Sequence, residues 1–473
     1  MFLAPVVLLA AVGVAGCGGS GSGGSGTKVI GNTAVTLLAT STANGQLFNF
    51  TLEIKSLSLT SQDGKTIVAL VSDPVGDDFI HLNGSAEPLV TNSIPQGVYT
   101  SATAIVAFDD PACAGANMVN SALATPQTDQ WPPVTIKLPQ PITVTGTAMA
   151  LALDLQVATS APFRSGCTTD LGGTVSVAPL FNLTAINASS AGLFNLLGTV
   201  GSVNAASQIS VMSLLDDNAA HNPAWDFSVN GSTIYQGVTS LSQLAVGLPV
   251  DLDAVMQPDG SLLITRIEAL DTNPTNVGVA YGPVVGQFAY HPGSVLALVS
   301  QSQGNVFAEL VDSYASTDSG FNISHQLDNL AGLPFTPVFN AATLVDGQNV
   351  LAVSHAQRVN GFPPGPPLPV TSMTLMPQTI NGTVSATGTA GTFTTYTVTL
   401  PAYDLFPAFA SQQGQSRQVT APDTIVVYVG ADTRQLTSGE PSVGGVFRFT
   451  GLIFNDNGVL RMDCSQVRDG VPE

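Results

Sequence analysis

The first part of the chain alternates apolar and polar side chains in the manner of β-strands. Residues 48–54 place an apolar side chain at every second position, which is the period of a strand with one buried face. After Lys55 the apolar positions shift by one residue, as a β-bulge would produce. Asp63-Gly64 then predicts a hairpin turn into a strand at residues 67–71.

The same patterning continues to about residue 189. Further strands are predicted at residues 79–82, 98–108, 134–138, 142–157 and 174–183. No segment of helical length carries apolar residues at helical spacing. We therefore expect residues 30–189 to form an antiparallel β-sandwich.

Two glycine motifs recur in the rest of the chain. Gly-x-Val/Phe begins at Gly198, Gly286 and Gly382, and Gly-x-x-Val/Phe begins at Gly247, Gly347 and Gly444. The later motifs are 100 and 97 residues apart, which is typical of one unit used three times. The sequence thus predicts an all-β chain in which the sandwich is followed by tandem small β-barrels at residues 190–273, 274–376 and 377–473. Closure into barrels would remove exposed strand edges.

Both parts of the chain resemble known families. The segments "FNFTLEIKSLSLTSQDGK", "DDFIHLNGSAEPLV" and "SIPQGVYTSATAIV" resemble a bacterial lipoprotein-associated domain of unknown function, family 4382, over about residues 30–185. This resemblance implies a prealbumin-like β-sandwich and brings no catalytic residues. The glycine pattern of the three later segments resembles domain-of-unknown-function family 5666, which implies a small barrel of about six strands.

The beginning of the sequence predicts export. Residues 2–16 are apolar and end in small residues, but they fall short of the roughly 20 residues that span a membrane. Val14-Ala15-Gly16-Cys17 resembles a bacterial lipobox, which implies cleavage of residues 1–16 and lipid on the Cys17 thiol. The alternative is an ordinary signal peptide in which Cys17 is incidental. An Asp directly after the lipidated Cys would favour retention at the inner membrane. This chain has Gly18 there, which favours the outer membrane or cell surface. Residues 17–29 are then a Gly/Ser tether.

The charge balance limits the classes of partner that this chain can bind. The chain has 12 basic against 32 acidic residues and a formal net charge of -20. This excludes a nucleic-acid binder, because a polyanion requires Lys and Arg to displace its counterions. An acidic protein is also repelled by anionic lipid, so we expect membrane attachment through the lipid anchor. Protein or glycan partners in the cell envelope remain.

The sequence nominates no catalytic constellation and no cofactor. It contains no Gly-x-Ser-x-Gly elbow, P-loop or dinucleotide fingerprint, which disfavours a hydrolase. The histidines are scattered singly and no two have metal-ligand spacing, so zinc is not expected. Adjacent aspartates occur at residues 77–78, 109–110 and 216–217. They are either solvated loop residues or the seed of a calcium site.

The tryptophans and cysteines supply the remaining candidates. Trp131 and Trp225 lie in loop-like surroundings, where an aromatic face can stack on a sugar or a partner, or can close the end of a barrel. Cys113 and Cys167 fall in loops of the first domain, and in an exported protein we expect them to form a disulfide that contributes about 4 kcal/mol. Cys464, in the last predicted strand, is then expected to be a buried small apolar residue.

Two classes of function follow. The first is a non-enzymatic, lipid-anchored envelope protein with a scaffold, adhesion or binding role, its four β-domains arranged in a row. The second is a ligand-binding lipoprotein for a glycan or calcium, with the loop around Trp225 as a contact.

Overall fold

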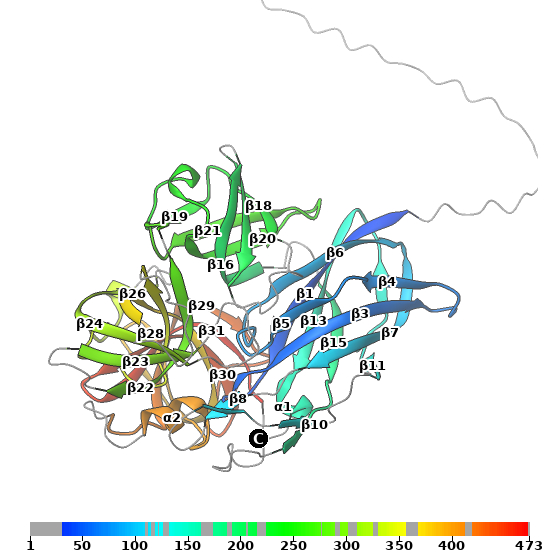
Figure 1. Cartoon of the computed structure of the whole chain (residues 1–473). Helices are drawn as coiled ribbons and strands as arrows, with labels where there is room; N and C mark the ends of the chain where they lie inside the picture. The colour runs from blue at the N-terminus through cyan, green and yellow to red at the C-terminus, as the bar shows by residue number, and fades with distance from the viewer. Residues whose placement is uncertain are drawn as a thin grey trace, which may run out of the picture.

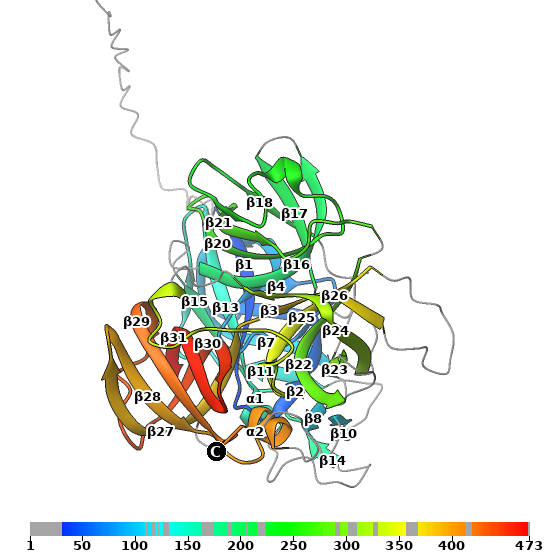
Figure 2. The ribbon, with the colours of Figure 1, turned by 90° about the vertical axis from the view of Figure 1, so that its left-hand side faces the viewer.

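β-Strands dominate the structure (Figures 1 and 2). The computed structural model describes residues 31–108, 112–114, 119–121, 123–125, 132–161, 174–186, 192–204, 207–214, 224–275, 277–288, 294–300, 310–324, 330–355, 368–411 and 419–471. The α-helices in these ranges, α1 (Val157–Ser160) and α2 (Leu405–Ala410), are each less than two turns long. The all-β prediction is confirmed.

The first fifteen strands form what we call the sandwich domain. One sheet has the order β15-β13-β1-β6, and the facing sheet has the order β11-β7-β3-β4, with β12 paired to β7 and β5 paired to β3. Two small sheets, β2-β8-β9 and β10-β14, lie beside them. The strands are β1 Asn32–Thr42, β2 Leu47–Asn49, β3 Thr51–Ser61, β4 Ile67–Val71, β5 Val75–Asp78, β6 Glu87–Pro95, β7 Gly97–Phe108, β8 Ala112–Ala114, β9 Val119–Ser121, β10 Leu123–Thr125, β11 Pro133–Ile136, β12 Ile142–Val144, β13 Ala148–Gln156, β14 Thr174–Ser176 and β15 Phe181–Ile186.

The long strand β3 follows its sequence pattern closely. Leu52 and Ile54 before the phase shift are buried, and so are Leu57 and Leu59 after it. The register against β7 shifts between Ile54 and Ser56, which confirms the bulge at Lys55. Both apolar sets therefore face the core between the two sheets.

Four details of the sandwich domain differ from the predictions, one of them being that the strand predicted over residues 174–183 is divided into β14 and β15. The pairing of β1 with β13 is parallel, because the long chain between them allows a crossover connection. Residues 79–82, predicted as a strand, form a turn in which the Asp78 carboxylate accepts hydrogen bonds from the backbone N–H groups of Phe50 (2.8 Å) and Ile80 (3.1 Å). The strand predicted over residues 142–157 is divided at Gly146, whose φ of 78° turns the chain.

The later strands form three sheets with the same cyclic order. We call them unit 1 (β16–β21), unit 2 (β22–β26) and unit 3 (β27–β31). Units 2 and 3 are closed barrels of order β22-β23-β24-β26-β25 and β27-β28-β29-β31-β30. In unit 1 the parallel pairing of β18 with β21 completes the corresponding ring β16-β17-β18-β21-β20. The strands are β16 Gly192–Asn204, β17 Gln208–Ser213, β18 Trp225–Ser228, β19 Ile234–Gln236, β20 Pro249–Met256, β21 Leu262–Ala269, β22 Gly278–Phe288, β23 Ser294–Ser300, β24 Leu310–Ile323, β25 Asn349–Ser354, β26 Leu368–Leu375, β27 Gln378–Ala390, β28 Phe393–Thr399, β29 Thr424–Leu436, β30 Val446–Asp456 and β31 Val459–Asp469.

The recurring glycines occupy equivalent places in these sheets. Gly247, Gly347 and Gly444 have φ values of 85°, 94° and 85° in the turn before β20, β25 and β30. Each turn exchanges two backbone hydrogen bonds with the first strand of its unit, through Val200 in unit 1, Val284 in unit 2 and Val384 in unit 3. Two residues before that valine, each unit has a glycine: Gly198, Gly282 or Gly382. The second copy of the Gly-x-Val/Phe motif is therefore Gly282-Pro283-Val284. The prediction of Gly286-Gln287-Phe288 was wrong.

The four domains pack into a closed cluster and not into the row that we expected. Leu38 and Ala150 of the sandwich domain belong to the apolar core of unit 1. Leu452 and Phe454 of unit 3 belong to the core of unit 2. A further apolar cluster joins units 1 and 2 through Leu197, Leu214, Leu270, Leu351, Val353 and Met376.

The sandwich domain also meets unit 3, at the far end of the sequence. The Arg448 guanidinium donates to Asn83 Oδ1 (2.7 Å), and Gln466 Nε2 donates to the Gly84 carbonyl (2.8 Å). Thr379 Oγ1 donates to the Asn83 carbonyl (2.6 Å). In Figure 2 the red and orange strands of unit 3 accordingly lie beside the blue and cyan strands of the sandwich domain. The turn at residues 79–86 is therefore part of a domain interface.

Candidate functional site

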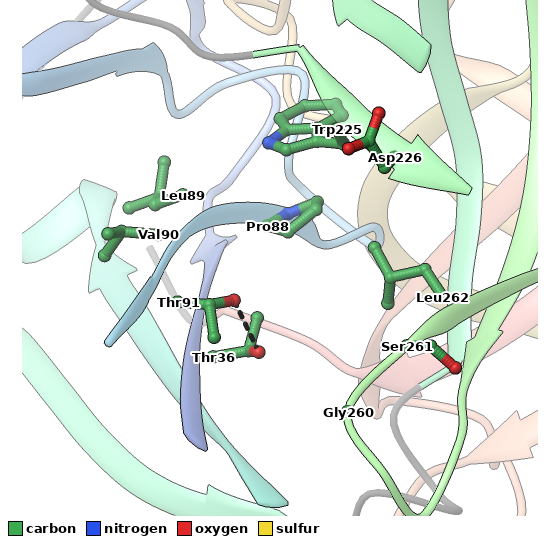
Figure 3. Close-up of a pocket in the computed structure, with 10 residues that line it drawn as sticks. All are labelled: Thr36, Pro88, Leu89, Val90, Thr91, Trp225, Asp226, Gly260, Ser261 and Leu262. Atoms are coloured by element: carbon green, nitrogen blue, oxygen red, sulfur yellow. Dashed lines mark hydrogen bonds between the residues drawn. The ribbon is translucent and has the colours of Figure 1, made fainter. Parts of the chain in front are cut away.

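A groove lies between the sandwich domain and unit 1 (Figure 3). Its volume is about 320 Å³, at the lower end of the range for small-molecule sites. The sandwich domain contributes one wall from β1 and β6, and unit 1 contributes the other from β18 and the turn between β20 and β21. The lining residues are Thr36, Pro88, Leu89, Val90, Thr91, Trp225, Asp226, Gly260, Ser261 and Leu262.

Trp225 is the largest side chain in the groove, and the strand pattern of β18 explains its position. Phe227 points into the core of unit 1 and is 1% exposed. Trp225 lies two residues earlier on the same face of the strand, so it packs against the edge of that core and remains half-buried. Trp225 thus packs against the core of unit 1 and lines the groove, and its role as a ligand contact stays a prediction.

The walls are held in place across the domain boundary. The Thr147 hydroxyl of the sandwich domain donates to the Pro258 carbonyl of unit 1 (3.3 Å). Gly260 has a φ of 88°, and a Cβ there would lie 3.1 Å from Ala148 of β13. The tight β20–β21 turn therefore rests directly on the sandwich domain, and the groove has two packed walls.

Polar groups are placed around the aromatic face. The hydroxyls of Thr36 and Thr91 share a hydrogen bond of 2.8 Å, drawn as the dashed line in Figure 3. Ser261 donates from its backbone N–H (3.0 Å) and its hydroxyl (2.7 Å) to Asp259, and these bonds lower the pKa of that carboxyl. Asp226 is exposed beside Trp225. An aromatic face flanked by hydroxyls and a carboxylate suits a small ligand with both apolar and hydroxyl-bearing faces.

A second group of side chains lies in the sandwich domain, next to this groove. Asp77 on β5, His81 in the following turn and Glu87 at the start of β6 bring their ligand atoms within 4.8 Å of one another. His81 Nε2 is 3.5 Å from Asp77 Oδ1 and 3.2 Å from Glu87 Oε1. The three side chains are 3%, 7% and 2% exposed, in chain order. Glu87 precedes Pro88 of the groove wall.

The charges in this group oppose the effect of burial. Burial lowers the pKa of His81, but the negative charges of Asp77 and Glu87 outweigh it and raise that pKa to about 10. The two neighbouring carboxyl groups therefore favour the protonated form of the His81 ring. This group could not be recognised from paired histidines or adjacent aspartates, because it contains a single histidine and its two carboxylates are ten residues apart. The spacing Asp-x3-His-x5-Glu around one turn was the signal available.

The other predicted site residues are distributed as follows. Trp225 lies in the groove, whereas Cys17, Trp131 and Cys167 lie outside the described residues. Cys113 lies on β8, but its side chain is not among those described, so the disulfide with Cys167 stays a prediction. Cys464 is a free, buried thiol in the core of unit 3, as expected, and burial raises its pKa.

Of the three adjacent aspartate pairs considered as calcium sites, the structure describes the pair at residues 77–78. Asp78 holds the backbone of the turn at residues 79–82, and its neighbour Asp77 faces His81. The pairs at residues 109–110 and 216–217 lie outside the described residues.

No family model matches the chain, and no curated protein matches it. Across the described residues, the helices are all too short or too polar to cross a membrane. The two family resemblances stay predictions.

Proposed function

We propose that this chain is a non-enzymatic, lipid-anchored protein of the cell envelope that binds a small ligand or partner segment between its first two domains. The observation that carries the proposal is the groove around Trp225, which has packed walls from two domains. The lining residues include no histidine, cysteine or lysine, and the two threonine hydroxyls are hydrogen-bonded to each other. A binding role fits this set better than nucleophilic catalysis does.

The ligand class that best suits the groove is a glycan. The half-buried indole of Trp225 offers a flat face to a sugar ring, and Asp226, Ser261 and Thr91 offer partners for its hydroxyls. The net charge of -20 disfavours polyanionic ligands. We therefore propose neutral oligosaccharides of the envelope as the ligand class, in preference to calcium at this groove.

We also propose that units 1, 2 and 3 are copies of one small barrel. Their shared cyclic strand order and the equivalent glycine turns support this proposal. Packed against one another and against the sandwich domain, the copies would act as a rigid scaffold for the groove. A lipid on Cys17 would attach this scaffold to the membrane through the tether at residues 17–29. Changing Cys17 to Ser should then release the chain from the membrane fraction. Retention after a carbonate wash would contradict the anchor.

Calorimetric titration of the intact chain with chitotetraose and cellotetraose tests the binding proposal. We expect saturable binding that Trp225→Ala abolishes and Trp131→Ala leaves unchanged. The second variant is the matched control because it removes the other tryptophan of the chain. Absence of binding to both sugars, or equal loss in both variants, would contradict a glycan site at Trp225.

A further inference from the structure

The group formed by Asp77, His81 and Glu87 has the geometry of a set of metal ligands. Ligand atoms bonded to one ion at about 2.0–2.2 Å are separated from their neighbours by about 2.8–3.6 Å in octahedral or tetrahedral arrangements. The two distances from His81 Nε2, 3.2 Å to Glu87 and 3.5 Å to Asp77, fall in that range. Because the Asp77 and Glu87 ligand atoms also lie within 4.8 Å of each other, a small cation could be bound between the three side chains.

The charge of the group also favours a divalent ion. Asp77 and Glu87 place two carboxyl groups beside the His81 imidazole, and the three side chains are almost fully buried. A divalent ion bound to two carboxylates and a neutral imidazole gives a net charge of zero. Neutrality matters here because burying an uncompensated charge is costly.

The donor types indicate which ion to expect. Calcium and magnesium prefer oxygen ligands throughout, whereas imidazole nitrogen suits zinc and its neighbours among the divalent transition metals. One nitrogen and two carboxylate oxygens supply three protein ligands, which leaves a further position for water. Zinc is the natural ion with which to test the group.

The position of the group gives such an ion a structural consequence. All three residues belong to one short stretch, the end of β5, the turn and the start of β6. The same turn contacts unit 3 through Asn83 and Gly84, and Ala86 packs against the core of unit 1. An ion that ties β5 to β6 at this place would hold the turn in the shape that both neighbouring domains require.

We propose that Asp77, His81 and Glu87 bind one divalent transition-metal ion, of the zinc type, which locks the β5–β6 turn against units 1 and 3. None of these three residues lines the groove, and the site does not depend on a lipid anchor. Its failure would leave the proposed function untouched.

Metal analysis of the intact chain tests the proposal. The protein is stripped with EDTA, dialysed against zinc chloride and then buffer, and analysed for bound zinc and for its melting temperature. We expect the wild type to bind one zinc per chain at this site, measured as the difference from the variants below. We also expect a higher melting temperature with zinc than without. Glu87→Gln and His81→Gln should each lose that zinc and the gain in melting temperature. His355→Gln is the matched control, because His355 pairs with a single carboxylate, Asp271, at 2.9 Å.

Two outcomes would overturn the proposal. One is wild-type protein that binds no zinc after reconstitution. The other is a folded Glu87→Gln protein that keeps the full zinc content. If Glu87→Gln fails to fold, X-ray absorption of the zinc-loaded wild type decides: a first shell of nitrogen and oxygen with one imidazole supports the site. A shell that contains sulfur, or one without imidazole, contradicts it.

Discussion

Thr233 and Thr433 make the same hydrogen bond in units 1 and 3. The Thr233 hydroxyl donates to the Ile264 carbonyl (2.8 Å), and the Thr433 hydroxyl donates to the Cys464 carbonyl (2.7 Å), in each case 31 residues further along the chain. In each unit the parallel pairing with the last strand is interrupted, and the threonine lies just before that pairing resumes. It resumes at β19 in unit 1 and at Arg434 of β29 in unit 3. The hydroxyl replaces a backbone partner at this interruption.

Replacing either threonine by valine should therefore destabilise its unit. The valine keeps the volume but leaves a buried carbonyl without its donor, at an expected cost of about 1–3 kcal/mol. Thermal or urea unfolding measures the effect. Thr265→Val is the control. The exposed Thr265 hydroxyl also donates to a carbonyl, that of Asp253, but water can take its place as the donor there. An effect of Thr265→Val as large as that of Thr233→Val would contradict this account.

The glycine turns predict a graded response to alanine. Gly247 and Gly444 have positive φ and open space at the Cβ position, so alanine should cost only the backbone strain of about 1–2 kcal/mol. A Cβ at Gly347 would also lie 3.0 Å from the ring of Phe406 on α2, so Gly347→Ala should destabilise more. Gly439→Ala, at an open position without positive φ, is the control. Equal melting temperatures for the Gly347 and Gly247 variants would contradict the added clash.

Asp463 should make stability depend on pH at the interface of units 2 and 3. It is paired across the strands with Leu452, which belongs to the core of unit 2, and burial raises its pKa to about 6. Because the folded state holds the proton more tightly than the unfolded state, stability should fall as pH rises from about 4 to 7. The loss is at most about 3 kcal/mol, given roughly 1.4 kcal/mol per pKa unit.

Asp463→Asn isolates this contribution. The neutral amide should leave stability unchanged near pH 4 and increase it at pH 8, so that the pH profile becomes flatter than that of the wild type. Melting temperatures measured across this pH range provide the comparison. A variant that is less stable than the wild type at pH 8 would show that the carboxylate has a favourable partner there.

Arg448 should hold the sandwich domain against unit 3. Its guanidinium donates to Asn83 Oδ1 and to the Ser41 carbonyl, so Arg448→Met should loosen the turn at residues 79–86. Hydrogen–deuterium exchange of that turn should become faster. Arg461→Met is the control, because Arg461 pairs with Asp456 inside unit 3. Faster exchange in the control, or none in Arg448→Met, would contradict the closed arrangement.

The sequence predicted the features that local physics determines. The bulge at Lys55 and the turns at Gly247, Gly347 and Gly444 could be recognised because a phase shift or a positive φ leaves its mark on neighbouring residues. The mostly apolar residues 79–82 were predicted as a strand, because nothing in the local sequence shows that Asp78 would bind the backbone of the turn. Apolar content alone does not distinguish a short strand from a buried turn.

The candidate site was predictable only in part. Trp225 was found because a tryptophan in a loop-like segment of a β-protein is conspicuous. Its opposite wall, residues 88–91, belongs to another domain, and the packing of that domain on unit 1 depends on side chains such as Leu38 that read as ordinary core residues. Contacts between domains that are distant in sequence leave no periodic pattern of apolar residues. For the same reason the sequence did not show that the four domains pack into a closed cluster, and a row was expected.

The fluorescence of Trp225 provides the most direct test of the binding groove. In a Trp131→Phe protein, Trp225 is the only tryptophan, and its half-buried indole faces the groove. Titration with chitotetraose or cellotetraose should shift its emission to shorter wavelength and protect it from iodide quenching, because a bound sugar excludes water from the ring. Emission and quenching that stay constant up to millimolar concentrations of both sugars would contradict a glycan site in this groove.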